Sequence, residues 1–100
     1  MLKLKSTIEP EAGRIVRRTV MKNPNGQVVL IAFDKNTGLP EHSVEADTLV
    51  LVLEGHVEFS SSDDTFPMDE GDYVTLRPGE VHKVYAALPA KIMVSQIFTK

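Results

Sequence analysis

The sequence contains no cysteine and no tryptophan, and no stretch of it stays apolar for long. The lack of cysteine excludes disulfides, thiolate metal sites and cysteine nucleophiles, and it fits a reducing compartment. No apolar run approaches the roughly 20 residues that cross a bilayer, and the first residues lack the apolar region of a signal peptide. We therefore expect a cytoplasmic protein with no membrane partner, in which only His, Asp or Glu could hold a metal.

Positive charge is also scarce. The chain has 11 basic and 14 acidic side chains, which gives a net charge of -3. The densest basic cluster is Arg14, Arg17 and Arg18, and strand alternation would divide these three between two faces. A nucleic-acid partner is therefore not expected, and the three arginines are assigned to solvent or to the rim of a dimer.

The residues that are present fit one globular domain over positions 1–100. A chain of this length has room for a single hydrophobic core. Hydrophobic residues make up 42% of it, and 6 glycines with 6 prolines are too few for a linker or a disordered chain. The protein is expected to fold without a second domain.

Short apolar runs separated by turn residues predict an all-β fold. Valine is frequent in these runs, and no segment has the period of a long helix. The predicted strands cover residues 14–21, 27–33, 48–53, 56–60, 73–76, 82–86 and 91–98. A sandwich, a closed barrel and a jelly roll all remain open at this level, with a small barrel favoured by the Val- and Leu-rich strands.

Two of the predicted strands, residues 28–33 and 49–53, are continuously apolar instead of alternating. Such strands are typically covered on both faces. One cover would be the barrel interior, and the other a second layer or a second subunit. Together with the exposed edge of an N-terminal strand, this predicts a homodimer with the N-terminal strands of residues 1–22 at its interface.

Two segments in the middle of the chain resemble the two motifs of the cupin superfamily. Residues 38–55 contain His42 and Gly55 at the positions of the first motif, and residues 71–82 contain Gly71, Gly79 and His82 at those of the second. The resemblance implies a double-stranded β-helix, a small jelly-roll barrel, with its core at about residues 27–98. It implies no single chemistry, because cupin barrels include isomerases, dioxygenases, storage proteins and regulatory domains.

The first motif departs from the family at two ligand positions. Val44 stands where the family has its second histidine, and Thr48 stands where it has its glutamate. Of the usual metal ligands, only His42 and His82 remain. A divalent Fe, Mn, Ni, Cu or Zn ion would be held weakly by two imidazoles, unless Glu41 or Glu45 supplied a third ligand.

The predicted pocket contains His42, Val44, Thr48, Thr75, His82, Val84 and Gln96. The leading hypothesis is a cupin of unassigned activity that binds a small polar or anionic molecule around the two histidines. One alternative is a metal-dependent dioxygenase or isomerase. The other is a sensing or accessory dimeric module, whose barrel would be plugged by Val44, Val84 and Met93.

Three further residues are predicted to lie outside the pocket. His56 follows Gly55 on an alternating strand and is expected at the surface in solvent. Tyr73 and Tyr85 are expected to pack in the core or in an interface.

Overall fold

The computed structural model describes residues 2–99, which form one helical turn and nine strands. The turn is α1 (Leu4–Thr7), and among the described residues no helix is long and apolar enough to span a membrane. The all-β prediction is confirmed. The strands are β1 (Ile15–Asn23), β2 (Gly26–Phe33), β3 (Thr37–His42), β4 (Ala46–Glu54), β5 (His56–Ser61), β6 (Asp64–Asp69), β7 (Tyr73–Leu76), β8 (His82–Ala86) and β9 (Ala90–Phe98).

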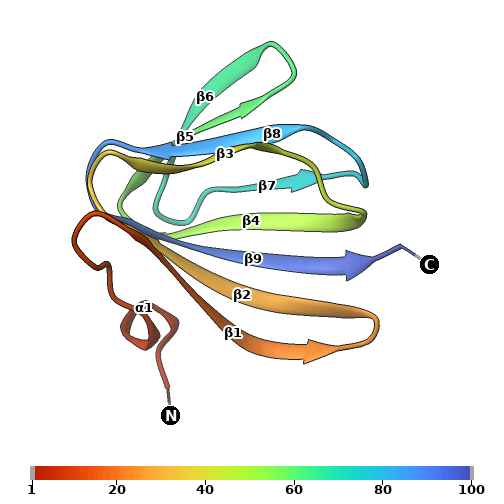
Figure 1. Ribbon diagram of the computed structural model, residues 1–100, viewed down its shortest axis with the longest axis horizontal. Helices are drawn as coiled ribbons and strands as arrows, with labels where there is room; N and C mark the ends of the chain where they lie inside the picture. Colours follow the sequence, from red (N-terminus) through yellow and green to blue (C-terminus); the bar gives the residue numbers. More distant parts are fainter. Residues whose placement is uncertain (1, 100) are drawn as a thin grey trace.

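The strands form two antiparallel sheets that face one another (Figure 1). The larger sheet has the order β1-β2-β9-β4-β7, and the smaller one has the order β3-β8-β5-β6. Strands distant in sequence are neighbours in both sheets, as in a jelly roll. The predicted double-stranded β-helix is therefore confirmed.

The strands β3 and β6 were not predicted, and both contain a proline. Pro40 lies in β3 and Pro67 in β6. Proline cannot donate to a sheet ladder, so it is confined to edges and irregular positions. Both strands are edges of the smaller sheet, where a missing amide hydrogen is tolerated. Because proline is typical of turns, the sequence of these two segments does not indicate a strand.

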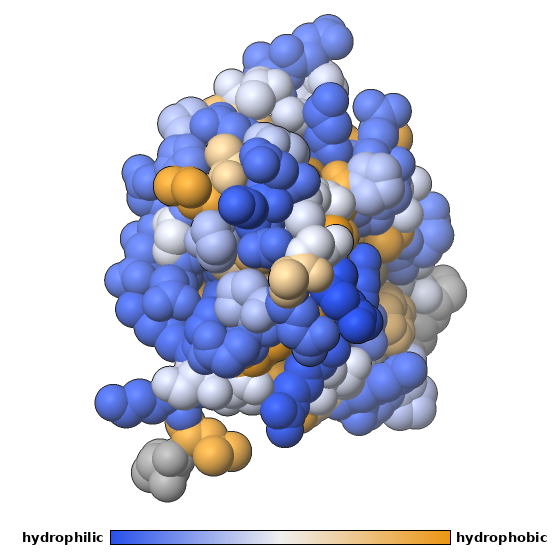
Figure 2. Space-filling view, turned by 60° about the vertical axis from the view of Figure 1, so that its left-hand side comes forward, coloured by the Kyte–Doolittle hydropathy of each residue, from blue (hydrophilic) through white to orange (hydrophobic). Residues whose placement is uncertain are grey.

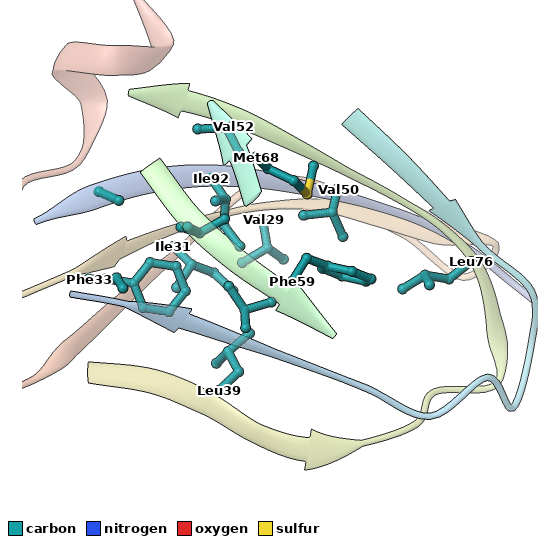
Figure 3. Close-up of a cluster of buried hydrophobic side chains, with 14 residues drawn as sticks. Val29, Ile31, Phe33, Leu39, Val50, Val52, Phe59, Met68, Leu76 and Ile92 are labelled. Carbon is teal, nitrogen blue, oxygen red and sulfur yellow. The ribbon is translucent and has the colours of Figure 1, made fainter. Parts of the chain in front are cut away.

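The core lies between the two sheets (Figure 3). Phe33 and Phe59 are its largest fully buried side chains, and Phe59 lies in the midst of the cluster. The remaining members alternate along their strands as the period of two requires. They are Val29, Ile31, Leu39, Val50, Val52, Val57, Met68, Leu76, Val84, Ala86, Ala90 and Ile92.

The N-terminal segment accounts for one of the two doubly covered strands. Leu30 and Ala32 of β2 face away from the barrel interior and form a second buried cluster with Ile8. Continuous apolar character in residues 28–33 therefore reflects a second layer made by the chain itself. The expectation of strands throughout residues 1–22 is wrong before Ile15, because α1 and the following loop lie there.

The two ends of the barrel differ. At the right of Figure 1, the β1–β2 turn, the β3–β4 and β7–β8 connections and the end of β9 gather at one end of the barrel. A cavity lies between the sheets at this end, which we call the mouth. The side brought forward in Figure 2 is largely hydrophilic, with apolar residues in small separate spots. A binding site is therefore to be sought at the mouth.

Candidate functional site

A cavity of about 510 Å³ opens between the two sheets at the mouth of the barrel. This volume is in the range of small-molecule sites. Its wall combines an apolar interior with a few polar groups. The lining residues are Arg17, Gln27, Ile31, Leu39, His42, Val44, Glu45, Ala46, Thr48, Val50, His82, Val84, Ile92, Val94, Gln96 and Phe98.

The cavity brings His42 and His82 together. They are direct partners in the β3–β8 ladder, and their ring centroids are 4.3 Å apart. A register shift between Leu39 and His42 lets both of these residues point inward although three positions separate them. The predicted pairing of the two histidines in one cavity agrees with this geometry.

Both imidazoles are fixed by a backbone carbonyl. His42 donates from Nδ1 to the carbonyl oxygen of Pro40 at 2.7 Å, and His82 donates from Nδ1 to that of Glu80 at 3.0 Å. Since a carbonyl oxygen only accepts, the proton is on Nδ1 in each ring. With this tautomer, the Nε2 atom of a neutral ring is left as a hydrogen-bond acceptor.

His82 is the more buried of the pair, with 6% of the residue exposed. Its ring stacks on Phe59 with centroids 5.9 Å apart. Burial lowers the pKa of His82, the neighbouring His42 acts in the same direction, and the hydrogen bond to Glu80 offsets this only in part. His82 is thus a neutral acceptor at physiological pH.

Most of the other predicted pocket residues line the same cavity. Val44, Thr48, Val84 and Gln96 all contribute to its wall. Thr75 does not, and its assignment to the pocket is corrected. It is paired with Leu49 on the outer face of the larger sheet, where it lines a separate hollow.

The cavity is not plugged in the way the accessory-module alternative requires. Val44 and Val84 contribute to its wall and leave it open. Met93 lies on the opposite face of β9, packed against the cluster of Ile8 and Leu30. The alternation of β9 places Ile92 and Val94 inside and Met93 outside.

Arg17 and Gln27 are cavity residues that the sequence analysis missed. Arg17 is paired with the core residue Ile31 and shares its inward face, whereas Arg18 points outward and donates to the carbonyl of Thr7 at 3.1 Å. Counting alternation from Ile15, itself packed on the core, would have identified Arg17. Arg17 is exposed, as its assignment to solvent predicted, but its side chain also lines the cavity, which that assignment did not include.

The amides of Gln27 and Gln96 form a polar patch on the same wall. They face each other across the β2–β9 ladder, and Gln27 Nε2 donates to Gln96 Oε1 at 2.7 Å. This bond uses one donor and one acceptor, so each amide keeps further hydrogen-bonding capacity for a ligand.

The donors present do not fit the metal site of the family. Glu41 lies in a different hollow, on the outside of the smaller sheet. Val44 offers only carbon, and the hydroxyl of Thr48 donates to the carbonyl of Ala46 at 3.3 Å. Glu45 reaches the cavity from the mouth loop, but residues 2–99 contain no group of three or more His, Asp or Glu side chains placed to hold an ion. We derive no chemistry through a metal.

The remaining predicted residues lie at the surface. His56 is exposed and is bound to Asp69 at 2.7 Å and to Glu58 at 3.0 Å, and these two hydrogen bonds raise its pKa. Tyr73 and Tyr85 are 65% and 45% exposed, so neither packs in the core, and their packing in an interface stays a prediction. The Tyr85 hydroxyl donates to Asn36 Oδ1 at 3.0 Å.

Comparison with known proteins agrees with the geometry. Residues 29–95 match the Cupin domain family. A conserved protein of unknown function from Streptococcus pyogenes superposes with a TM-score of 0.92 at 21% identity, covering 100% of this chain and 88% of that one. A cupin superfamily protein from Desulfitobacterium hafniense gives 0.94 at 19% identity, with coverage of 98% and 90%.

A third similar structure is an RmlC-like cupin from Desulfovibrio desulfuricans, with a TM-score of 0.85 at 26% identity and coverage of 97% and 94%. No curated protein matches the sequence. These structures share the fold and assign no activity. Because the family match spans more than half of the sequence and the histidines of both motifs line one cavity of a jelly roll, the chain belongs to the cupin family.

Proposed function

We propose that this cupin binds a small organic anion in the cavity at the barrel mouth. The observation that carries the proposal is Arg17. Its side chain lines the cavity, and neither an ion pair nor a hydrogen bond joins its guanidinium to another residue within 2–99. A guanidinium matches carboxylates by two parallel charge-assisted hydrogen bonds.

The charge of the cavity wall favours a ligand with a single negative charge. Arg17 is the one arginine or lysine and Glu45 the one carboxylate among the described lining residues. His82 is neutral, so it does not add to the positive charge. A carboxylate balances Arg17, whereas a phosphate monoester would place up to two negative charges beside Glu45.

The interior supplies an apolar site for the rest of the ligand. Ile31, Leu39, Val84 and Ile92 line the cavity behind the polar groups. Burying a short hydrocarbon chain against them is favourable by about 0.8 kcal/mol per methylene group. A carboxylate with a short apolar body is thus the class of ligand that this wall fits.

Calorimetric titration with hexanoate, 1-hexanol and hexylamine tests this proposal, because the three probes share one chain and differ in head-group charge. We expect hexanoate to bind most tightly and hexylamine least. The Arg17→Gln variant should bind hexanoate about tenfold or more weakly, which corresponds to one charge-assisted hydrogen bond. Arg18→Gln is the matched control, since Arg18 points away from the cavity, and it should leave the affinity unchanged.

Equal affinity for hexanoate and hexylamine would contradict the proposal, because a cavity that selects anions through Arg17 must discriminate between them. An equal loss in the Arg17 and Arg18 variants would also contradict it, since the effect would then be one of general surface charge. A cytoplasmic location is part of the same proposal and is supported by the cysteine-free composition.

We also propose that the outer face of the larger sheet pairs with a second copy of the chain. Beyond the part covered by the N-terminal segment, this face presents apolar side chains near the mouth, and Met21 and Ile97 are 65% and 67% exposed. An apolar hollow joins them with Val28, and such faces are typically interfaces.

Sedimentation velocity should show a dimer that Ile97→Lys shifts to monomer, while Leu88→Lys, at an equally exposed loop position, does not. A monomeric wild type at micromolar concentration would contradict this assignment.

A further inference from the structure

The hydrogen-bonding character of the two cavity walls narrows the class of ligand. The larger sheet contributes Arg17, a donor with positive charge, together with the amides of Gln27 and Gln96, which can both donate and accept. The smaller sheet contributes His42 and His82, whose Nδ1 protons are already given to backbone carbonyls. The two sheets face each other, so the donor and the acceptors stand on opposite walls.

The imidazole side of the cavity can accept a hydrogen bond from a ligand that donates. His82 has 6% exposure and its ring is enclosed between Phe59 and His42, so its orientation is fixed by packing as well as by the Glu80 carbonyl. Its free Nε2 is an acceptor that a carboxylate cannot satisfy, because two acceptors repel each other. A hydroxyl group can donate to it without any charge.

We propose that the cavity is selective for hydroxycarboxylic acids, with the carboxylate on Arg17 and the hydroxyl donating to an imidazole Nε2 of His42 or His82. This rests on the proposed anion-binding function and adds the second polar group of the ligand. The apolar side chains of Ile31 and Val84 lie on the wall of the same cavity and contact the hydrocarbon part of the ligand.

Adding a terminal hydroxyl to an alkanoate tests this proposal, because the affinity rises if the cavity holds a suitable acceptor and falls if it does not. In an apolar cavity without a suitable acceptor, adding a hydroxyl to an alkanoate weakens binding, because the group loses its water and gains no partner. With a fixed acceptor at the right depth, the same hydroxyl strengthens binding. The ligand chain length that gives the largest increase in affinity then reports the distance between Arg17 and the imidazole acceptor.

The experiment titrates a series of ω-hydroxyalkanoates, from 4-hydroxybutanoate to 8-hydroxyoctanoate, against the matching unsubstituted alkanoates. Protein-detected NMR provides the affinities. At the optimal length we expect the hydroxy acid to bind about three- to tenfold more tightly than its alkanoate, the range of one neutral hydrogen bond. In the His42→Phe variant the ratio of hydroxy-acid affinity to alkanoate affinity should fall, because one of the two imidazole acceptors is removed.

The outcomes separate the two proposals. If alkanoates bind through Arg17 but the hydroxyl weakens binding at every chain length, the selectivity for hydroxy acids is wrong and the anion site stands. If no carboxylate binds in the cavity, both are wrong.

Long-range proton–nitrogen NMR of the imidazoles gives an independent check on the wild type. A proton on Nε2 in place of Nδ1 in both rings would overturn the assignment of the acceptors.

Discussion

Phe59→Ala is expected to lower the free energy of unfolding by about 3–5 kcal/mol, the usual cost of emptying a buried phenylalanine site. Phe59 is fully buried between the sheets and is among the largest side chains of the core. A domain of this size is stable by about 5–15 kcal/mol in total, so the variant should approach the limit of folding. Urea unfolding followed by circular dichroism measures the change.

The same substitution should disturb the site, because Phe59 supports the ring of His82 by stacking. The matched control is Phe66→Ala on the neighbouring strand β6, where the side chain is 37% exposed. We expect the control to lose much less stability, since its site can fill with water. Similar losses in both variants would show that the core is not centred on Phe59 as described.

Lys91→Met is expected to release the N-terminal segment from the outer face of the larger sheet. The Lys91 side chain is 6% exposed, and its Nζ donates to the carbonyl of Lys5 at 2.6 Å, to Glu9 at 3.1 Å and to Glu54 at 3.2 Å. Burial alone would lower the pKa of Lys91, but the two carboxylates more than offset this and raise it. The ammonium is therefore charged and joins the segment to β9.

Methionine keeps the apolar stem of Lys91 and removes its donors, so the segment is then held mainly by the packing of Ile8. We expect a loss of about 2 kcal/mol, typical of hydrogen bonds to a charged group. Trypsin should cut after Lys5 roughly thirtyfold faster in the variant, since about 1.4 kcal/mol corresponds to a factor of ten. Lys83→Met on β8 is the control, because Lys83 is exposed and faces away from this segment. Unchanged cleavage in Lys91→Met would show that the ammonium does not hold the segment in place.

The fold was largely predictable from the sequence because its main strands carry strong period-two or continuous apolar signals. The strands missed were β3 and β6. Pro40 and Pro67 give them the composition of turns, which an edge strand tolerates because one side of it makes no hydrogen bonds to the sheet. Nor could the sequence decide what covers the outer face of residues 28–33. That cover depends on a contact with Ile8, more than twenty positions away.

The candidate site was predicted only in part. The motif spacing placed His42 and His82 together, but it gave no account of the opposite wall. Arg17 reaches the cavity because it is paired with Ile31 across the β1–β2 ladder. Alternation along the sequence does not fix which residues of two strands are paired. Thr75 was assigned to the pocket for its polarity, although its neighbours Val74 and Leu76 are the inward pair of that short strand.

The central claim is that an organic anion binds inside the barrel mouth on Arg17. The most direct measurement is an NMR titration of labelled protein with hexanoate, recording side-chain shifts and contacts between ligand and protein protons. We predict shifts at the Arg17 guanidinium and at the Gln27 and Gln96 amides, with contacts from the ligand chain to Ile31 and Val84 methyl groups. Contacts confined to Met21 and Ile97 in the outer hollow, with no shift at Arg17, would contradict the account.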